Sequence, residues 1–147
     1  MVNKKFSLGM LVMILVLGMT VVGGCDLEED GPLVGTVWTR SSSTSGPYGF
    51  NLTHTLSFVD SKNATHNESG WNMLNNKKTN VNETSNYTYN YNTPSARKGV
   101  LNPSNGTSGI GIIFEVSADG KTLTTTSANT KVGLTGGTWT LKSGSVK

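Results

Sequence analysis

The sequence contains only one cysteine, Cys25, so no disulfide can form within the chain. The folded part must therefore be stabilised by its core alone. Charged residues are also few, at 14% of the chain. From Gly31 onward there are ten basic and five acidic residues, a net charge of +5, and the basic residues are scattered. Scattered charge of this size indicates a mildly basic, soluble surface, and we expect no nucleic-acid partner.

The residue sets that usually carry catalysis or bind a metal are missing as well. The chain has no HExxH motif and no GxSxG motif. Its two histidines, His54 and His66, are separated by a predicted strand end and a turn. A two-histidine metal site completed by Asp60 or Glu68 is conceivable, but its spacing follows no recognised pattern. We therefore expect no catalytic residues, no metal and no cofactor, and we do not expect an enzyme.

No part of the chain after residue 32 has the three-and-four spacing of an amphipathic helix. Apolar residues instead alternate with Thr, Ser and Asn, which is typical of β-strands. The expected strands are residues 34–40, 51–59, 67–73, 87–91, 97–101, 110–116, 121–127, 131–134 and 138–142. Asp119-Gly120 and Gly136-Gly137 supply hairpin turns. The polar stretches 41–49, 75–84 and 93–107 are predicted to be loops.

This spacing of strands predicts one all-β domain, either an up-and-down barrel or a sandwich. Roughly eight or nine short strands joined by brief turns account for the chain after the first 32 residues. The side chains expected inside the domain are Trp38, Phe58, Phe114, Val116, Leu123, Trp139 and Leu141.

The N-terminal region has the three parts of an export signal in the right order. Lys4 and Lys5 make a basic start, an apolar run covers residues 6–22, and two glycines precede Cys25. The run is near the lower limit for a membrane-spanning helix of about 20 residues, so an uncleaved anchor is the alternative. The tetrapeptide Val22-Gly23-Gly24-Cys25, however, resembles the lipobox of bacterial lipoproteins, which favours cleavage directly before the cysteine.

The lipobox resemblance divides the chain into a signal peptide at 1–24, a lipidated acidic tether at 25–32 and a folded domain at 33–147. It implies diacylglycerol on Cys25, with further acylation such as palmitate, and a protein anchored to a bacterial membrane in the cell envelope. Two or three acyl chains, at about 0.8 kcal/mol per buried methylene, anchor a protein stably. Asp26 resembles the inner-membrane retention signal of enteric bacteria, but that rule does not extend to all bacterial groups, so inner and outer membrane remain alternatives.

Both ends of the domain resemble lipocalin-like bacterial domains. The opening LVGTVW, residues 33–38, is similar to their first strand, although Val37 interrupts the pattern, and Gly137-Thr138-Trp139 is similar to their closing strand. The segment FEVSADGKTLT, residues 114–124, resembles a hairpin late in such barrels. The resemblance implies an antiparallel up-and-down barrel of about eight strands whose interior can hold an apolar or amphipathic ligand.

Three tyrosines form the strongest local pattern in the domain. Tyr87, Tyr89 and Tyr91 alternate, so their rings lie on one face of one strand. They could form a packing ladder, line a ligand pocket with Trp71 as a candidate neighbour, or make an external patch for a protein partner. The leading hypothesis is a lipid-anchored, lipocalin-like binding protein. The alternative is an envelope scaffold or an interaction or adhesion lipoprotein with a filled barrel.

Lipid attachment through Cys25 is directly testable. Radiolabelled palmitate should enter the wild-type protein and be absent from Cys25→Ser, because serine cannot form the thioether. The mature mass should also correspond to a lipidated chain that begins at residue 25. Labelling that survives the substitution would refute the lipobox interpretation.

Overall fold

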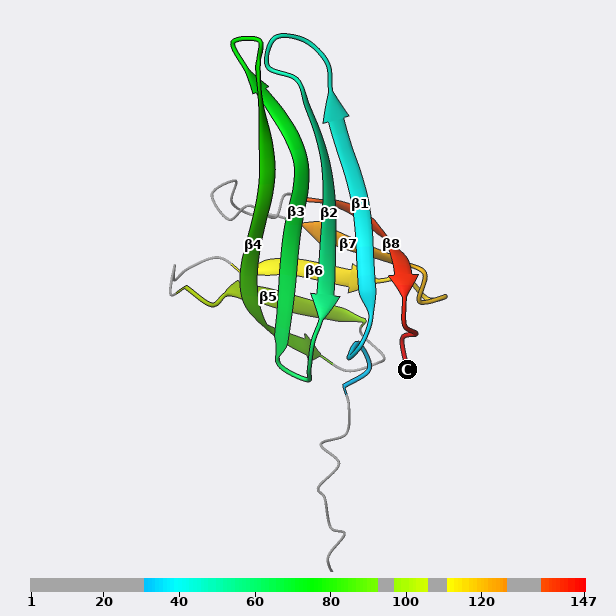
Figure 1. Ribbon diagram of the computed structural model, residues 1–147. Coiled ribbons are helices and arrows are strands. Elements are labelled where there is room, and N and C mark those ends of the chain that lie inside the picture. The colour runs from blue at the N-terminus through cyan, green and yellow to red at the C-terminus, as the bar shows by residue number, and fades with distance from the viewer. Residues whose placement is uncertain (1–30, 93–96, 106–110, 127–135) are drawn as a thin grey trace, which may run out of the picture.

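The computed structural model describes residues 31–92, 97–105, 111–126 and 136–147, and all its regular elements there are β-strands (Figure 1). Within these ranges no helix has the length and hydropathy needed to cross a membrane. The signal peptide, Cys25 and the expected strand 131–134 lie outside the described residues.

Eight strands follow one another around a single sheet in chain order. Their bounds are β1 Val37–Thr44, β2 Phe50–Phe58, β3 Asn63–Leu74, β4 Lys77–Asn92, β5 Lys98–Pro103, β6 Ile112–Val116, β7 Thr122–Thr126 and β8 Gly137–Ser143. Each strand pairs antiparallel with the next, and β8 pairs antiparallel with β1, so the sheet closes into a barrel. The predicted all-β, antiparallel up-and-down barrel of eight strands is confirmed.

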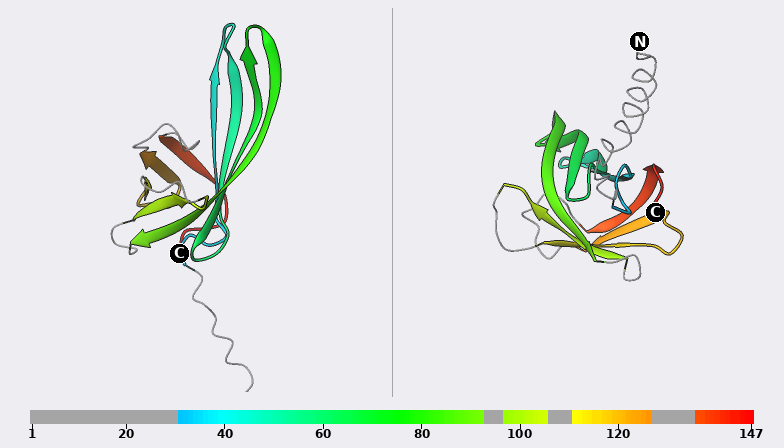
Figure 2. Two further views of the ribbon diagram at one scale, coloured as in Figure 1. Left: turned by 90° about the vertical axis from the view of Figure 1, so that its left-hand side faces the viewer. Right: turned by 90° about the horizontal axis from the view of Figure 1, so that it is seen from below.

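The first four strands are taller than the barrel they help to close. In the described part of the chain, β8 pairs with β1 only at 37–39, and β5 pairs with β4 only at 87–92. Beyond these pairs, β1 to β4 rise as an open, curved sheet (Figure 2). We call residues 41–53 and 69–82 the distal extension.

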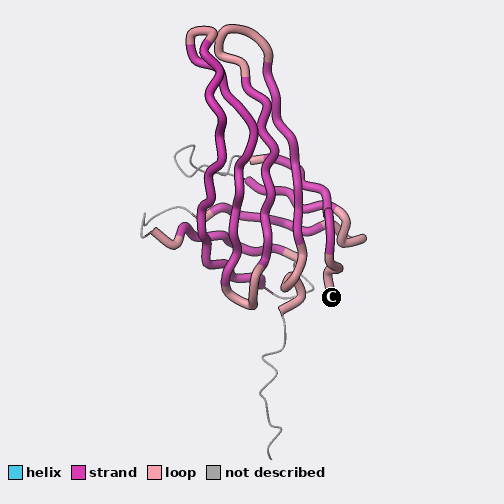
Figure 3. Tube along the Cα trace, viewed as in Figure 1, coloured by secondary structure: helices cyan, strands magenta, loops and turns pink. Residues whose placement is uncertain are grey.

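The beginning of the described chain and its C-terminus lie at the end of the barrel opposite the distal extension (Figure 1, Figure 3). The backbone N–H of Lys147 donates to the carbonyl of Pro32 at 3.0 Å, which joins the two segments. The predicted tether therefore enters the domain at one end, and the tips of the β1–β2 and β3–β4 hairpins lie at the other.

Large apolar side chains fill the closed part of the barrel. The buried hydrophobic residues are Leu33, Trp38, Leu56, Phe58, Ala64, Tyr87, Tyr89, Leu101, Ile112, Phe114, Val116, Leu123 and Trp139. They form one cluster, and Leu141 packs against it partly buried. The predicted core is confirmed, with Leu141 at its margin.

Both buried indoles find hydrogen-bond partners on threonine, which removes the cost of burying their N–H groups. Trp38 Nε1 donates to Thr36 Oγ1 at 2.9 Å, and that hydroxyl in turn donates to the carbonyl of Leu33 at 2.6 Å. Trp139 Nε1 donates to Thr125 Oγ1 at 3.1 Å. These contacts explain why Thr36 and Thr125 are buried among apolar residues.

The predicted loops 41–49 and 75–84 are wrong over much of their length. Strand β1 continues to Thr44, and residues 77–84 belong to β4. The β3–β4 connection is only Asn75-Asn76, whose φ angles of 51° and 62° are typical of a two-residue hairpin turn that asparagine tolerates. Similarly, β5 occupies part of the predicted loop 93–107. The polar composition misled the prediction, because strands of the open extension need no apolar face to cover a core.

A pair of neighbouring residues on β6 tests the assignment of inner and outer faces. Phe114→Ala should lower the free energy of unfolding by about 3–5 kcal/mol, because it leaves a cavity in the core. Ile113→Ala, at a position 52% exposed on the same strand, should change it by less than about 1 kcal/mol. Urea unfolding followed by tryptophan fluorescence measures both values, and equal losses would contradict the assignment.

Candidate functional site

Polar and charged side chains gather on the inner face of the sheet where the closed barrel meets the distal extension. Arg40 of β1, His54 of β2, and His66 and Glu68 of β3 form this group, which we call the mouth cluster. The ring of Trp139 meets both imidazoles edge-on, with centroids 6.2 Å from His54 and 5.9 Å from His66. The cluster thus lies directly on the apolar core.

The turn between β2 and β3 sets the register that assembles this cluster. Oδ1 of Asp60 accepts hydrogen bonds from the backbone N–H groups of Lys62 and Asn63, each at 2.8 Å. The Asn63 side-chain amide also donates to the carboxylate. These hydrogen bonds lower the pKa of Asp60, and the hydrogen bond from the Asn63 side chain has the largest effect. Asp60 is therefore a turn residue, remote from the histidines.

With this turn in place, Leu56 pairs with His66, and His54 pairs with Glu68. Directly opposed residues on one face lie about 5 Å apart, so the two histidines become diagonal neighbours. Of the two carboxylates considered from the sequence, the structure brings Glu68 to the histidines and leaves Asp60 at the turn. Recognition of the turn residues at 60–63 as a hairpin would have predicted this pairing.

Three potential ligand atoms converge in the mouth cluster. Nδ1 of His54 is 3.3 Å from Nε2 of His66 and 3.4 Å from Oε2 of Glu68. All three donor atoms lie within 4.8 Å of one another. The two imidazoles are nearly parallel, with an interplanar angle of 10°, and they are only 4% and 3% exposed. Two imidazole nitrogens and one carboxylate oxygen are a donor set typical of zinc.

Ser42 forms a hydrogen bond with the other ring nitrogen of His54. Its Oγ lies 3.0 Å from Nε2 of His54, and the roles of donor and acceptor depend on the tautomer of the ring. A neutral imidazole carries one N–H and one acceptor nitrogen. When Nε2–H donates to Ser42, Nδ1 is therefore the acceptor and presents its lone pair to His66 and Glu68.

Arg40 places a positive charge beside these groups. Its guanidinium lies over Trp139, with Cζ 5.0 Å from the ring centroid, and Nη1 donates to the carbonyl of Gly136 at 2.9 Å. A Cβ atom at position 137 would collide with the guanidinium, so Gly137 is what lets Arg40 lie close to β8. Arg40 thereby connects the edge of the cluster to the last strand.

Burial and the charge of Arg40 favour neutral histidines. Burial, followed by His54 and Arg40, lowers the pKa of His66 to about 4. Burial and then Arg40 also lower the pKa of His54. Burial and then the carboxylate of Glu83 raise the pKa of Glu68, which Arg40 partly offsets. The two buried imidazoles are thus held largely uncharged next to the partly exposed carboxylate of Glu68.

The order Ser42, His54 and Glu68 is also that of a catalytic triad, but two features oppose that function. Nδ1 of His54 is shared with His66, so the carboxylate is not the sole group that orients the ring. The lowered pKa of His54 also makes it a weaker base for a serine hydroxyl. The arrangement is better suited to holding a ligand than to activating a nucleophile.

The three tyrosines share one face of β4, as their alternation predicts, and that face is directed into the barrel. Tyr87 and Tyr89 are buried, and Tyr91 packs against the core partly buried. The ring of Tyr89 meets Phe58 edge-on at 4.8 Å between centroids, and its hydroxyl donates to the carbonyl of Asp60 at 2.8 Å. These are core contacts, which favours the packing interpretation over an external patch.

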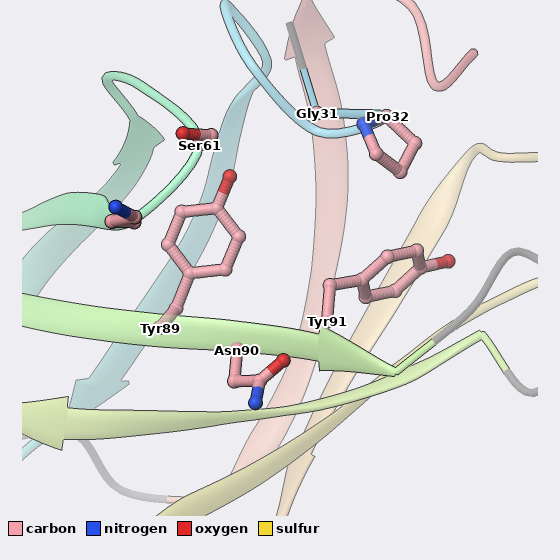
Figure 4. Close-up of a pocket in the computed structure, with 7 residues that line it drawn as sticks. Gly31, Pro32, Ser61, Tyr89, Asn90 and Tyr91 are labelled. Atoms are coloured by element: carbon pink, nitrogen blue, oxygen red, sulfur yellow. The ribbon is translucent and has the colours of Figure 1, made fainter. Parts of the chain in front are cut away.

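A crevice of about 420 Å³ opens beside Tyr89 and Tyr91 at the end of the barrel where the described chain begins (Figure 4). The other lining residues are Gly31, Pro32, Ser61, Lys62 and Asn90. Figure 4 shows the Tyr89 hydroxyl directed toward the segment that carries Ser61, and the Tyr91 ring directed away from it. A ligand held by these tyrosines would lie next to the tether.

Trp71 does not join the tyrosines, so its expected role as their neighbour is wrong. It pairs with Asn80 in the distal extension, whereas Tyr87 pairs with Ala64 near the opposite end of β3. Alternation along β3 places the Trp71 ring on the outer face of the sheet. There Lys78 Nζ lies 4.9 Å from its ring centroid.

Comparisons of the chain with protein-family models, with curated proteins and with solved structures gave no match. Among the residues that the structure describes, we consider three candidate sites, which are the mouth cluster, the tyrosine crevice and the outer face of the distal extension.

The hydroxyl of Tyr89 provides a pH-dependent test of the tyrosine contacts. Burial, with a smaller contribution from Asp60, raises the pKa of Tyr89 to about 12, whereas an unfolded chain ionises tyrosine at about 10. Between these values the folded state retains a proton that the unfolded state loses, so this contribution to stability is present below pH ~10 and is lost as the pH rises toward ~12.

Tyr89→Phe should therefore lower the free energy of unfolding by about 1 kcal/mol at neutral pH, through the lost hydrogen bond. The difference between the variant and the wild-type protein should shrink as the pH rises above about 10. Urea unfolding over this pH range measures it. A difference that stays constant would show that the hydroxyl is not held in its buried contact.

Proposed function

We propose that this protein is a lipid-anchored cell-envelope protein that binds a protein partner with the end of the barrel farthest from its anchor. The observation that carries the proposal is the opposition of the two ends of the domain. The segment that follows the predicted tether enters at one end, and the distal extension rises from the other (Figure 1). With lipid on Cys25, the hairpin tips would point away from the membrane.

The filled core supports an interaction protein over a carrier with an internal ligand. A carrier needs a cavity of about 300 Å³ or more, whereas an eight-stranded barrel is narrow enough for side chains to fill. Here the rings of Trp38, Phe58, Phe114 and Trp139 are at most 1% exposed and occupy the closed part of the barrel. The crevice at Tyr89 and Tyr91 supports the alternative of a small ligand bound near the membrane surface.

The distal extension offers the kind of surface a protein partner uses. Tyr48 and Leu74, at the two hairpin tips, are each 64% exposed. The extension also carries a groove of about 480 Å³, whose apolar lining residues are Phe50, Trp71 and Met73. Aromatic residues and methionine are enriched where proteins bind one another. Trp71, predicted as a binding residue, would then contact the partner rather than a ligand of the tyrosines.

The two hairpin tips are held together, so this surface is a defined shape. Tyr48 Oη donates to Asn75 Oδ1 at 3.1 Å, and the backbone N–H of Met73 donates to the carbonyl of Gly49 at 2.7 Å. The backbone N–H of Asn76 donates to the carbonyl of Pro47 at 3.4 Å. Contacts between the tips reduce the ordering cost that a partner would otherwise have to offset.

Photo-crosslinking in living cells tests the proposal. A photoreactive amino acid in place of Tyr48 should give a discrete adduct, whereas one in place of Ile113, which is also exposed but lies on the barrel wall, should give none. Trp71→Ala should reduce the Tyr48 adduct at least tenfold, as expected for a hot-spot aromatic residue that contributes about 2 kcal/mol or more. Circular dichroism should show an unchanged barrel in that variant.

Equal adducts from the two photoreactive positions, or an adduct that Trp71→Ala leaves unchanged, would contradict the proposal. Native mass spectrometry of protein taken from its own cells separates the alternative. A bound small molecule that is lost in a Tyr89→Ser, Tyr91→Ser variant would assign function to the crevice instead.

A further inference from the structure

We propose that His54, His66 and Glu68 form a binding site for a divalent transition-metal ion, for which Zn²⁺ is the best match. This inference goes beyond the proposed partner binding and does not depend on it or on lipid attachment. The expectation of no metal arose because a predicted strand end and a turn separate the histidines, and because their spacing follows no recognised pattern. Pairing of β2 with β3 removes that separation.

The spacing of the donor atoms is that of a tetrahedral metal centre. Ligands at about 2.0–2.1 Å from a tetrahedral Zn²⁺ lie about 3.3 Å from one another. The distances from His54 Nδ1 to His66 Nε2 and to Glu68 Oε2 are 3.3 Å and 3.4 Å. The donor atoms of His66 and Glu68 lie within 4.8 Å, so a small movement of the flexible Glu68 side chain completes the third edge.

Ser42 holds His54 in the orientation that such a site needs. A histidine that ligates through one nitrogen usually donates its other N–H to a neighbouring acceptor, which fixes the ring and its tautomer. Here Nδ1 of His54 faces the other two ligands, and Nε2 lies 3.0 Å from Ser42 Oγ. On binding the metal, the neutral ring takes the Nε2–H tautomer and donates to Ser42.

The rigidity of the surroundings supports a prearranged site. Trp139 makes T-shaped contacts with both imidazoles, which are almost fully buried, so the rings have little room to move. Glu68 is the exception, because its side chain is 22% exposed and lies toward the distal extension. An ion would therefore enter from the extension, and water or a partner's side chain would complete the coordination there.

The charges around the site allow a cation. Arg40 lies on the same face, and its positive charge disfavours a bound cation. Its guanidinium, however, contacts the ring of Trp139 and donates to the carbonyl of Gly136. Glu68 and its cross-strand neighbour Glu83 contribute two carboxylates. The two carboxylates of this cross-strand pair thus outnumber the guanidinium.

Zinc titration of the full-length mature protein, purified from membranes in detergent with a histidine-free affinity tag, tests the proposal. After dialysis against a chelator, competition with a chromogenic zinc indicator should give one bound Zn²⁺ per chain. Co²⁺ in its place should produce the visible absorption of a tetrahedral nitrogen and oxygen site. His66→Gln should weaken Zn²⁺ binding by at least about 100-fold, and Ser42→Ala by about tenfold.

Matched variants serve as controls for loss of the fold and for metal binding by other residues. Glu68→Gln changes a partly exposed residue and should also weaken binding by at least about tenfold, whereas Glu115→Gln makes the same charge change at the exposed pair with Lys98 and should leave binding unchanged. Wild-type protein that takes up no Zn²⁺, or equal affinity in the wild-type and Glu68→Gln proteins, would overturn the proposal.

Discussion

Closure of the sheet between β1 and β8 is the constraint on which the rest of this structure depends. The pairing of Trp38 with Leu141 joins the first strand to the last, and it turns an open meander into a barrel with a dry interior. Trp38 and Trp139 stand on either side of this seam, and their indole N–H groups are satisfied by Thr36 and Thr125. Without a disulfide, this buried cluster must provide the stability of the domain.

Among the described residues, strand β8 pairs with β1 only at residues 37–39. The mouth cluster lies where this pairing stops. Beyond the residues of β1 that pair with β8, the inner face of β1 to β3 changes from tryptophan, leucine and phenylalanine to arginine, histidine and glutamate. Polar groups placed at such a boundary are buried enough to be held rigidly, and they remain close enough to solvent to be reached. Burial without partners would be costly, and here each imidazole contacts a neighbouring polar group.

The proposed functions use the barrel as a rigid support and place recognition at its distal end. Under this proposal, the tether at one end and the two joined hairpins at the other would separate membrane anchoring from partner binding. The mouth cluster lies between them, below the distal extension and above the core. A metal ion held there would bind β2 to β3 at the base of the extension, so it could stiffen the surface offered to a partner.

Several features of the fold could be predicted from the sequence because they follow from local alternation. Period-two spacing determines which residues of 51–59, 87–91 and 112–116 share one face, and the turn at Asp119-Gly120 is determined by residues that tolerate its backbone geometry. Strand lengths in the distal extension could not be predicted in this way. Most of its residues are polar, and their pairing depends on the neighbouring strand rather than on burial in the core.

The amino-acid sequence by itself predicted an all-β domain, favoured an antiparallel barrel through its lipocalin-like resemblance, indicated seven of the side chains inside it, and placed Tyr87, Tyr89 and Tyr91 on one face. Only the tertiary structure decided that Trp71 lies far from the tyrosines, and that His54, His66 and Glu68 meet. The physical reason is that alternation specifies the face of a residue, whereas its neighbours on that face are set by strand register. The hydrogen bonds of the Asp60 turn set the register of β2 and β3, and closure against β8 sets the depth at which their side chains are buried.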